Sequence, residues 1–105
     1  MKSLRKAIFA SLLALGICQA HAEDGVTDSS ITLGMSAPFT GPNGLYGMQM
    51  REAMTAYFDQ VNKNGGVNGR KIELITIDDG YETDRTVANT KSLIQEKKVF
   101  ALMGY

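Results

Sequence analysis

The sequence is poor in the residue types that most catalytic and metal sites require. Its 105 residues include one cysteine, one histidine, two prolines and no tryptophan. Cys18 and His21 both lie near the N-terminus, so a chain that loses residues 1–22 has neither a thiol nor an imidazole. Their loss excludes disulfides, Cys–His and Ser–His–Asp nucleophilic catalysis, and ordinary zinc sites. We therefore expect a protein that is not an enzyme and that holds no metal and no cofactor.

Residues 1–22 have the pattern of a cleavable export signal. Three basic residues among the first six precede an apolar run at 7–18, and Ala20-His21-Ala22 supplies the small-x-small motif that signal peptidase recognises. The run is too short to span a bilayer, which needs about 20 residues. Ile17 stands before Cys18 where a lipoprotein signal has a small residue. We therefore expect release into the periplasm of a mature chain that comprises residues 23–105.

Charge argues against nucleic acid as a partner. The signal removes three of the eleven basic residues and leaves eight against eleven acidic ones, so the mature chain is acidic. Such a chain offers no basic surface to nucleic acid or to an anionic membrane. Its length suffices for one small domain, which we expect to be monomeric.

Apolar periodicity predicts five elements in the order β-α-β-α-β. They are a strand at 31–36, a helix at 45–62, a strand at 71–77, a helix at 85–97 and a strand at 99–104. The first helix should bury an apolar stripe made of Met50, Ala53, Met54, Tyr57, Phe58 and Val61. The second should turn inward Val87, Thr90, Leu93 and Ile94.

The ends of these elements carry their own signals. Thr83 and Asp84 are candidate N-caps of the second helix, and Lys97 and Lys98 suit its C-terminal end. The unbroken apolar run at 99–104 is typical of a parallel strand that is covered on both faces. Glu73, within the second strand, favours an edge position.

Crossover rules then predict an α/β fold with a doubly wound parallel sheet of three strands in the order 2-1-3. Right-handed connections place one helix on each face of this sheet. The strand order reverses between strands one and three, which makes a topological switch point, and ligands bind such sheets there, outside the carboxyl ends of the strands. Two loops flank the crevice, one after Ser36 and one after Gly104. Because the sequence ends there, we expect only the first part of a lobe.

The loop after Ser36 reads PFTGPNGLYG, from Pro38 to Gly47, and is not a phosphate-binding loop. Its glycines recur every third residue and no lysine follows, unlike the glycine-rich loops that bind nucleotides. Two interpretations of its aromatics, Phe39 and Tyr46, stay open. They either pack under the loop as local core or form part of a site for a small ligand with an apolar side chain. Met48, Met50 and Met54 we assign to helix core.

The acidic residues after the second strand do not predict a metal site. Asp78, Asp79, Glu82 and Asp84 lack the alternating spacing of a calcium loop. A phosphoacceptor receiver domain shares the 2-1-3 topology but carries its acidic pair after strand one, where this chain has Ala37-Pro38. We therefore expect a hydrated strand end, followed by carboxylates that complement the dipole of the second helix.

The combination of three segments resembles the leucine/isoleucine/valine-type periplasmic binding proteins. These segments are ITLGMSAPFTGPNGLYG, NKNGGVNGRKIELITIDDGYETD and VFALMGY. The resemblance implies part of the N-terminal lobe of a hinged, two-lobed receptor that delivers an amino acid or a similar small solute to an ABC permease. It also implies ligand-binding roles for Tyr46, Phe39, Thr40, Gly41 and Tyr105. Some relatives form a disulfide near the position of Tyr81, and this chain has no cysteine there.

The sequence leaves three functional hypotheses. The first is that the full-length product binds a small solute as the extracytoplasmic component of an importer. The second is that the truncated chain binds little or nothing and aggregates through the open edge of its third strand. The third is that it is the ligand-binding domain of a sensory receptor, since the same fold serves that role. The identity of the solute is left open.

Overall fold

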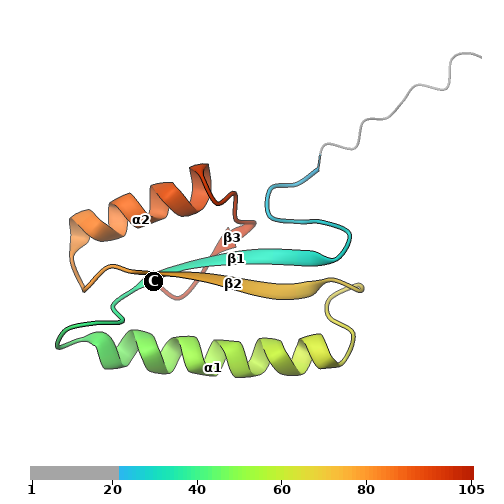
Figure 1. The fold of residues 1–105 in the computed structure, drawn as a ribbon, viewed down its shortest axis with the longest axis horizontal. Coiled ribbons are helices and arrows are strands. Elements are labelled where there is room, and N and C mark those ends of the chain that lie inside the picture. Colours follow the sequence, from blue (N-terminus) through green and yellow to red (C-terminus); the bar gives the residue numbers. More distant parts are fainter. Residues whose placement is uncertain (1–21) are drawn as a thin grey trace, which may run out of the picture.

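A computed structural model describes residues 22–105, and the predicted export signal lies outside the described residues apart from Ala22. The elements are β1 (Ser30–Ala37), α1 (Gly44–Lys63), β2 (Lys71–Asp78), α2 (Thr83–Gln95) and β3 (Ala101–Leu102). The three strands are parallel and lie in the order β2-β1-β3. The sheet separates α1 from α2, which cover its opposite faces (Figure 1). The predicted fold class and strand order are confirmed.

The long pairing between β1 and β2 sets the register of the sheet. All eight residues of each strand pair, from Ser30 with Lys71 to Ala37 with Asp78. β2 is an edge strand, and Glu73 on it is exposed, as predicted. The Asn62 side chain at the end of α1 donates to the Ile72 carbonyl at 2.9 Å and accepts from the Ile72 N–H at 2.8 Å. This pair of bonds occupies backbone groups that an edge strand otherwise leaves open.

The predicted third strand is wrong in length. β3 has two residues, which pair with Leu33 and Gly34 of β1, in place of the six expected from the apolar run. Positive φ angles at Lys98 (53°) and Gly104 (75°) bend the backbone before and after this segment. The expectation of burial on both faces also fails, because Phe100 is 50% exposed. The described elements leave that side of the strand uncovered.

The buried core is small and lies beside β1. Its hydrophobic members are Met35, Ala37, Leu93 and Val99. Leu93 of α2 approaches β1 closely because residue 34 is glycine, where a Cβ would lie 3.0 Å from a Leu93 methyl group. Burial of Leu93 confirms the predicted inner face of α2 at this position.

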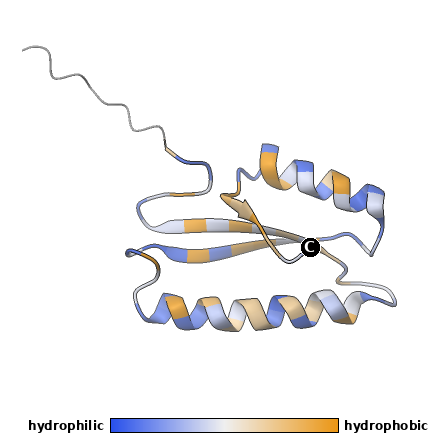
Figure 2. Cartoon of the chain, turned by 180° about the vertical axis from the view of Figure 1, so that it is seen from behind, coloured by the Kyte–Doolittle hydropathy of each residue, from blue (hydrophilic) through white to orange (hydrophobic). Residues whose placement is uncertain are grey.

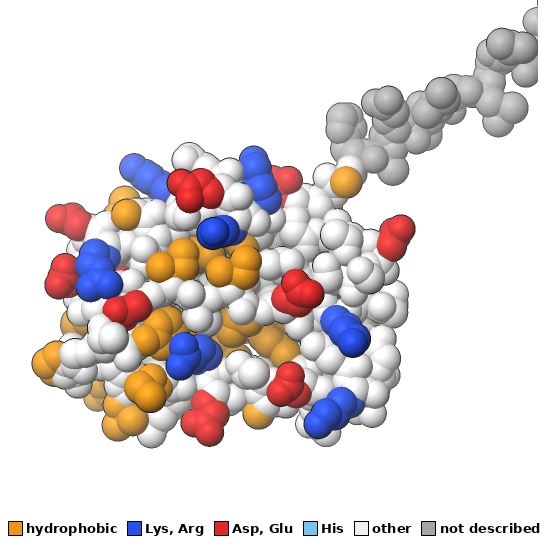
Figure 3. All heavy atoms as spheres, in the orientation of Figure 1, with side chains coloured by type: hydrophobic (Ala, Val, Ile, Leu, Met, Phe, Trp, Pro, Cys, Tyr) orange, Lys and Arg blue, Asp and Glu red, His pale blue; other side chains and the backbone are white. Residues whose placement is uncertain are grey.

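The predicted apolar stripes are wider than the faces that the structure buries. Val87 and Ile94 on α2, and Met50 and Tyr57 on α1, are each at least 43% exposed. Hydrophobic positions recur along both helices (Figure 2), and hydrophobic side chains also reach the surface among charged ones (Figure 3). A three-stranded sheet is narrow, so it covers only part of each helix face.

The boundaries of α2 also differ from the prediction. Glu82 is the N-cap and makes no side-chain capping bond, whereas Thr83 and Asp84 lie within the first turn. The Glu82 N–H donates to the Asp79 carbonyl at 3.0 Å, which closes a tight turn and starts the helix early. The helix ends at Gln95, before both lysines that were expected to close it. No helix within residues 22–105 is long and apolar enough to cross a membrane.

Candidate functional site

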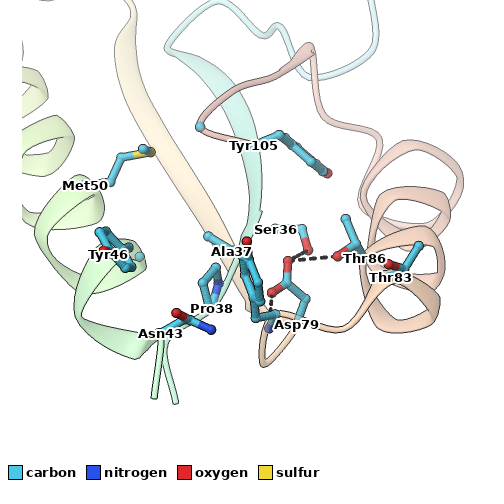
Figure 4. Close-up of a pocket in the computed structure, with 13 residues that line it drawn as sticks. Ser36, Ala37, Pro38, Asn43, Tyr46, Met50, Asp79, Thr83, Thr86 and Tyr105 are labelled. Atoms are coloured by element: carbon cyan, nitrogen blue, oxygen red, sulfur yellow. Dashed lines mark hydrogen bonds between the residues drawn. The ribbon is translucent and has the colours of Figure 1, made fainter. Parts of the chain in front are cut away.

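A cavity of about 760 Å³ lies at the carboxyl ends of the strands, at the predicted switch point. Contributions come from the end of β1, the first turns of α1 and α2, the loop after β2 and the segment after β3 (Figure 4). The lining residues are Ser36, Ala37, Pro38, Asn43, Tyr46, Gly47, Met50, Asp79, Tyr81, Thr83, Thr86, Gly104 and Tyr105. Apolar and hydroxyl-bearing side chains therefore share one concave surface, as small-molecule sites require.

The α1 side of the cavity depends on a close approach of helix and loop. A Cβ at Gly47 would lie 1.9 Å from the Pro38 carbonyl oxygen, and a Cβ at Gly44 would lie 3.0 Å from the Phe39 carbonyl. Both glycines are buried. The first turn of α1 thus rests directly on the loop backbone, which places Tyr46 at the cavity.

Asp78 ties the loop after β1 to the end of β2. Its carboxylate accepts hydrogen bonds from the Phe39 N–H at 2.7 Å, the Thr40 hydroxyl at 2.7 Å and the Gly80 N–H at 3.1 Å. The Arg85 guanidinium lies 3.2 Å from the same carboxylate. The Phe39 N–H, the Thr40 hydroxyl, the Gly80 N–H and Arg85 hold the pKa of Asp78 well below its usual range, against a smaller opposing effect of desolvation.

This lowered pKa predicts an acid-dependent loss of stability. A carboxylate with a depressed folded-state pKa stabilises the chain above the unfolded pKa of about 3.9 and stops doing so as the pH falls through the folded value. We expect wild type to exceed Asp78→Asn in melting temperature at pH 7 and the gap to narrow steadily below about pH 4. Thermal unfolding between pH 7 and pH 2 measures both curves. A gap that stays constant over this range contradicts the assignment.

Asp79 is buried, and the expectation of a hydrated strand end is wrong for it. It is 4% exposed, and its carboxylate accepts from the Ser36 hydroxyl at 3.0 Å, the Thr86 hydroxyl at 3.1 Å and the Tyr81 N–H at 2.9 Å. Asn89 in turn donates to the Ser36 hydroxyl at 3.1 Å. The network joins β1, the loop after β2 and α2 at the floor of the cavity (Figure 4).

The structure brings two of the five predicted ligand-binding residues to the cavity. Tyr46 and Tyr105 line it, and they are 71% and 57% exposed. The hydroxyls of Tyr105 and Thr90 are hydrogen-bonded at 3.0 Å, which holds the Tyr105 ring near α2. Met50, assigned to helix core from the sequence, also lines the cavity.

The other three predicted residues lie outside the cavity lining. The Arg51 guanidinium lies over the Phe39 ring, 4.6 Å from the ring centroid. The Thr40 hydroxyl donates a hydrogen bond to the Asp78 carboxylate. Gly41 is exposed, with a φ of 75° and open space around it. In this conformation the three residues shape and anchor the loop.

Several cavity residues were not predicted from the sequence to belong to the ligand site. Ser36 and Asp79 lie at the carboxyl ends of neighbouring parallel strands. Ligand sites form at these ends, so the predicted strand boundaries could have indicated both residues. Thr83 and Thr86 are three residues apart and therefore share one face of α2. Within residues 22–105, no group of three or more His, Cys, Asp or Glu side chains is placed to hold a metal ion.

Comparison with known proteins identifies the family to which the chain is similar. The profile of the family described as "Periplasmic binding protein" matches residues 30–105. The Leu/Ile/Val-binding protein BraC3 of Rhizobium johnstonii is 33% identical over 94 residues, which cover 90% of this chain and 23% of that protein.

Solved structures agree with the family match. A branched-chain amino acid transporter substrate-binding protein, LivJ, from Streptococcus pneumoniae in complex with isoleucine has a TM-score of 0.69 at 27% identity, over 73% of this chain and 22% of that one. A fatty acid ABC transporter substrate-binding protein from Thermomonospora curvata has a TM-score of 0.67 at 34% identity, over 75% and 20%. The chain spans about a quarter of the length of the curated relatives it matches. The family match covers most of the chain, and the chain belongs to the periplasmic binding protein family.

Proposed function

We propose that this protein binds a small solute that carries a carboxylate and an aliphatic side chain, an amino acid of the branched-chain type being the leading candidate. The observation that carries the proposal is the cavity at the switch point, where Tyr46 and Tyr105 stand at the ends of different elements around one hollow. Isoleucine and fatty acids, named for two similar proteins, share this pairing of a carboxylate with an aliphatic chain.

The apolar part of the cavity suits an aliphatic group. Ala37, Pro38 and Met50 contribute apolar surface, and the Tyr46 ring adds a large flat contact. A methionine adapts its shape to different aliphatic chains, because its side chain is unbranched and flexible. Burial of a leucine-sized side chain against such surfaces is worth about 1.5–3 kcal/mol when it is complete.

The polar part of the cavity offers hydroxyl groups in place of a free charge. Thr83 brings a hydroxyl to the lining, whereas the Tyr105 hydroxyl is already paired with Thr90 and the Asp79 carboxylate already accepts three hydrogen bonds from the protein. A negative group that is satisfied in this way has little capacity left for a solute. We therefore assign Asp79 to the support of the site and the Thr83 hydroxyl to solute contact.

The proposed role in transport extends to location and partner. We propose that residues 1–22 direct the chain to the periplasm and are removed there, and that the complete protein passes its solute to an ABC permease as a monomer. The similar protein from Thermomonospora curvata is named as an ABC transporter component, which supports the part of this proposal that concerns transport. Intact mass of protein from the periplasmic fraction should correspond to a chain that begins at Glu23. Recovery of only the uncleaved chain contradicts the proposed signal.

Isothermal titration of the purified chain with L-leucine, L-isoleucine and L-valine tests binding. We expect saturable binding of at least one probe and a loss of affinity of about tenfold in Tyr46→Ala, since removal of an aromatic contact costs about 1–1.5 kcal/mol. Leu45→Ala is the matched control, because Leu45 is 63% exposed and lies outside the cavity lining. Its affinity should equal that of wild type. An absence of heat with all three probes in wild type refutes solute binding by this chain.

A further inference from the structure

Tyr81 adopts a backbone conformation that its own packing does not explain. Its φ is 67°, in the left-handed region that side chains with a Cβ rarely occupy, and it follows Gly80 at 60°. The side chain is 72% exposed. Neither burial nor a hydrogen bond of its hydroxyl within residues 22–105 offsets the strained backbone. Strain that stability does not account for is concentrated at functional sites.

Asp79 fixes the backbone conformation of Tyr81 through two hydrogen bonds, one to its side chain and one to its backbone carbonyl. Its carboxylate accepts the Tyr81 N–H at 2.9 Å and its carbonyl accepts the Glu82 N–H at 3.0 Å, so one residue clamps the turn on both sides. Asp79 is itself held by the hydroxyls of Ser36 and Thr86. The turn is therefore fixed to the sheet and to α2.

The consequence of the turn is that Tyr81 lines the cavity from the loop after β2, whereas Tyr46 lines it from the first turn of α1. Tyr81 and Tyr46 therefore line the cavity from two different elements of the fold. We propose that Tyr81 is a selectivity-determining wall of the solute site, which contacts the aliphatic part of the solute, and that Asp79 is its positioning residue. This inference rests on the proposed solute binding and adds a contact to it.

Tyr81→Gly tests the two effects that the proposal predicts, a gain in stability and a loss of affinity for solutes with a large aliphatic side chain. Glycine occupies the left-handed region freely, and relief of this strain outweighs the greater entropy of glycine in the unfolded chain. We expect the melting temperature to rise by about 2–4 °C. Affinity for L-leucine should fall about tenfold and affinity for L-alanine less than threefold, because alanine has little aliphatic surface to contact the ring. Tyr81→Phe should retain the wild-type preference for leucine.

A double-mutant cycle tests the positioning role of Asp79. Asp79→Asn should weaken L-leucine binding about threefold in the wild-type background and have no effect on it in the Tyr81→Gly background. A residue that acts only on overall stability would weaken binding in both backgrounds. Independent effects of the two substitutions overturn the positioning role.

The outcomes distinguish this inference from the proposed function. If wild type and Tyr81→Gly bind L-leucine with equal affinity, Tyr81 does not determine selectivity, and the proposed solute binding still stands. Failure of wild type to bind any of L-leucine, L-isoleucine and L-valine overturns both the solute binding and the role of Tyr81. A melting temperature that falls in Tyr81→Gly shows that the left-handed backbone is not strained, and this also overturns the inference.

Discussion

Gly47→Ala is expected to lower the free energy of unfolding by about 2 kcal/mol, although alanine is the better helix former. The added Cβ would lie 1.9 Å from the Pro38 carbonyl oxygen and 2.7 Å from its carbon. Helix propensity favours alanine by about 1 kcal/mol, while overpacking against a fixed backbone at so short a distance costs about 3 kcal/mol, the upper end of the usual range, and forces α1 away from the loop. The clash therefore outweighs propensity. Urea unfolding monitored by circular dichroism gives the difference.

A matched comparison is available one turn earlier on the same helix. At Gly44 the nearest atoms to an added Cβ are the Phe39 carbonyl carbon and oxygen, both at 3.0 Å, so a shift of a few tenths of an ångström relieves the contact. Gly44→Ala should thus be less harmful than Gly47→Ala. Solute affinity should also fall in Gly47→Ala, because Tyr46 moves with the first turn of α1. Equal or higher stability of Gly47→Ala than of wild type refutes the close approach.

The sequence was sufficient to predict the layers and the strand order because those depend on regular patterns. Apolar periodicity and an acidic residue on the edge strand are local signals, and the handedness of crossovers then leaves few topologies. The length of β3 was not predictable in the same way. Its apolar run at 99–104 is continuous, but left-handed backbone at Lys98 and Gly104 ends the pairing. Apolar composition carries no information about such bends.

The candidate site was predictable in position but only partly in membership. The switch point follows from topology, and Tyr46 and Tyr105 both line the cavity there. Phe39 and Thr40 are close in sequence to Tyr46, yet the loop turns one toward Arg51 and the other toward Asp78. Direction within an irregular loop depends on individual hydrogen bonds between distant residues. Sequence spacing does not report these bonds.

The burial of Asp79 is another feature that the sequence alone did not predict. Two adjacent carboxylates after a strand predict exposure, since unpaired charges are rarely buried. Asp78 keeps partial contact with solvent, whereas Asp79 alternates to the opposite side of the backbone and finds hydroxyls from Ser36 and Thr86. These partners are 43 and 7 residues away. Burial of the second carboxylate could be inferred only once those partners were known to meet it.

Asp79→Ala is expected to lower the free energy of unfolding by about 3 kcal/mol. The substitution removes three hydrogen bonds to a carboxylate that is 4% exposed and leaves the Ser36 hydroxyl, itself 1% exposed, without its acceptor. Each buried polar group that loses its partner costs about 1–3 kcal/mol, and partial entry of water at the cavity reduces the total. A domain of this size is stable by roughly 4–12 kcal/mol, so the loss is severe. Chemical denaturation of wild type and variant measures it.

Comparison with milder variants separates the network from simple loss of volume. Thr86→Val removes one of the three donors and should cost about 1 kcal/mol, which also gives a measurable value if Asp79→Ala does not fold. In the cycle of Asp79→Ala with Ser36→Ala, the double variant should be more stable than the sum of the single effects predicts, by about 1 kcal/mol, because removal of both partners leaves no orphaned hydroxyl. Additive effects would show that Ser36 and Asp79 stabilise the fold independently. Coupling would show that the floor of the cavity is one cooperative unit, on which Tyr81 and α2 both depend for their position.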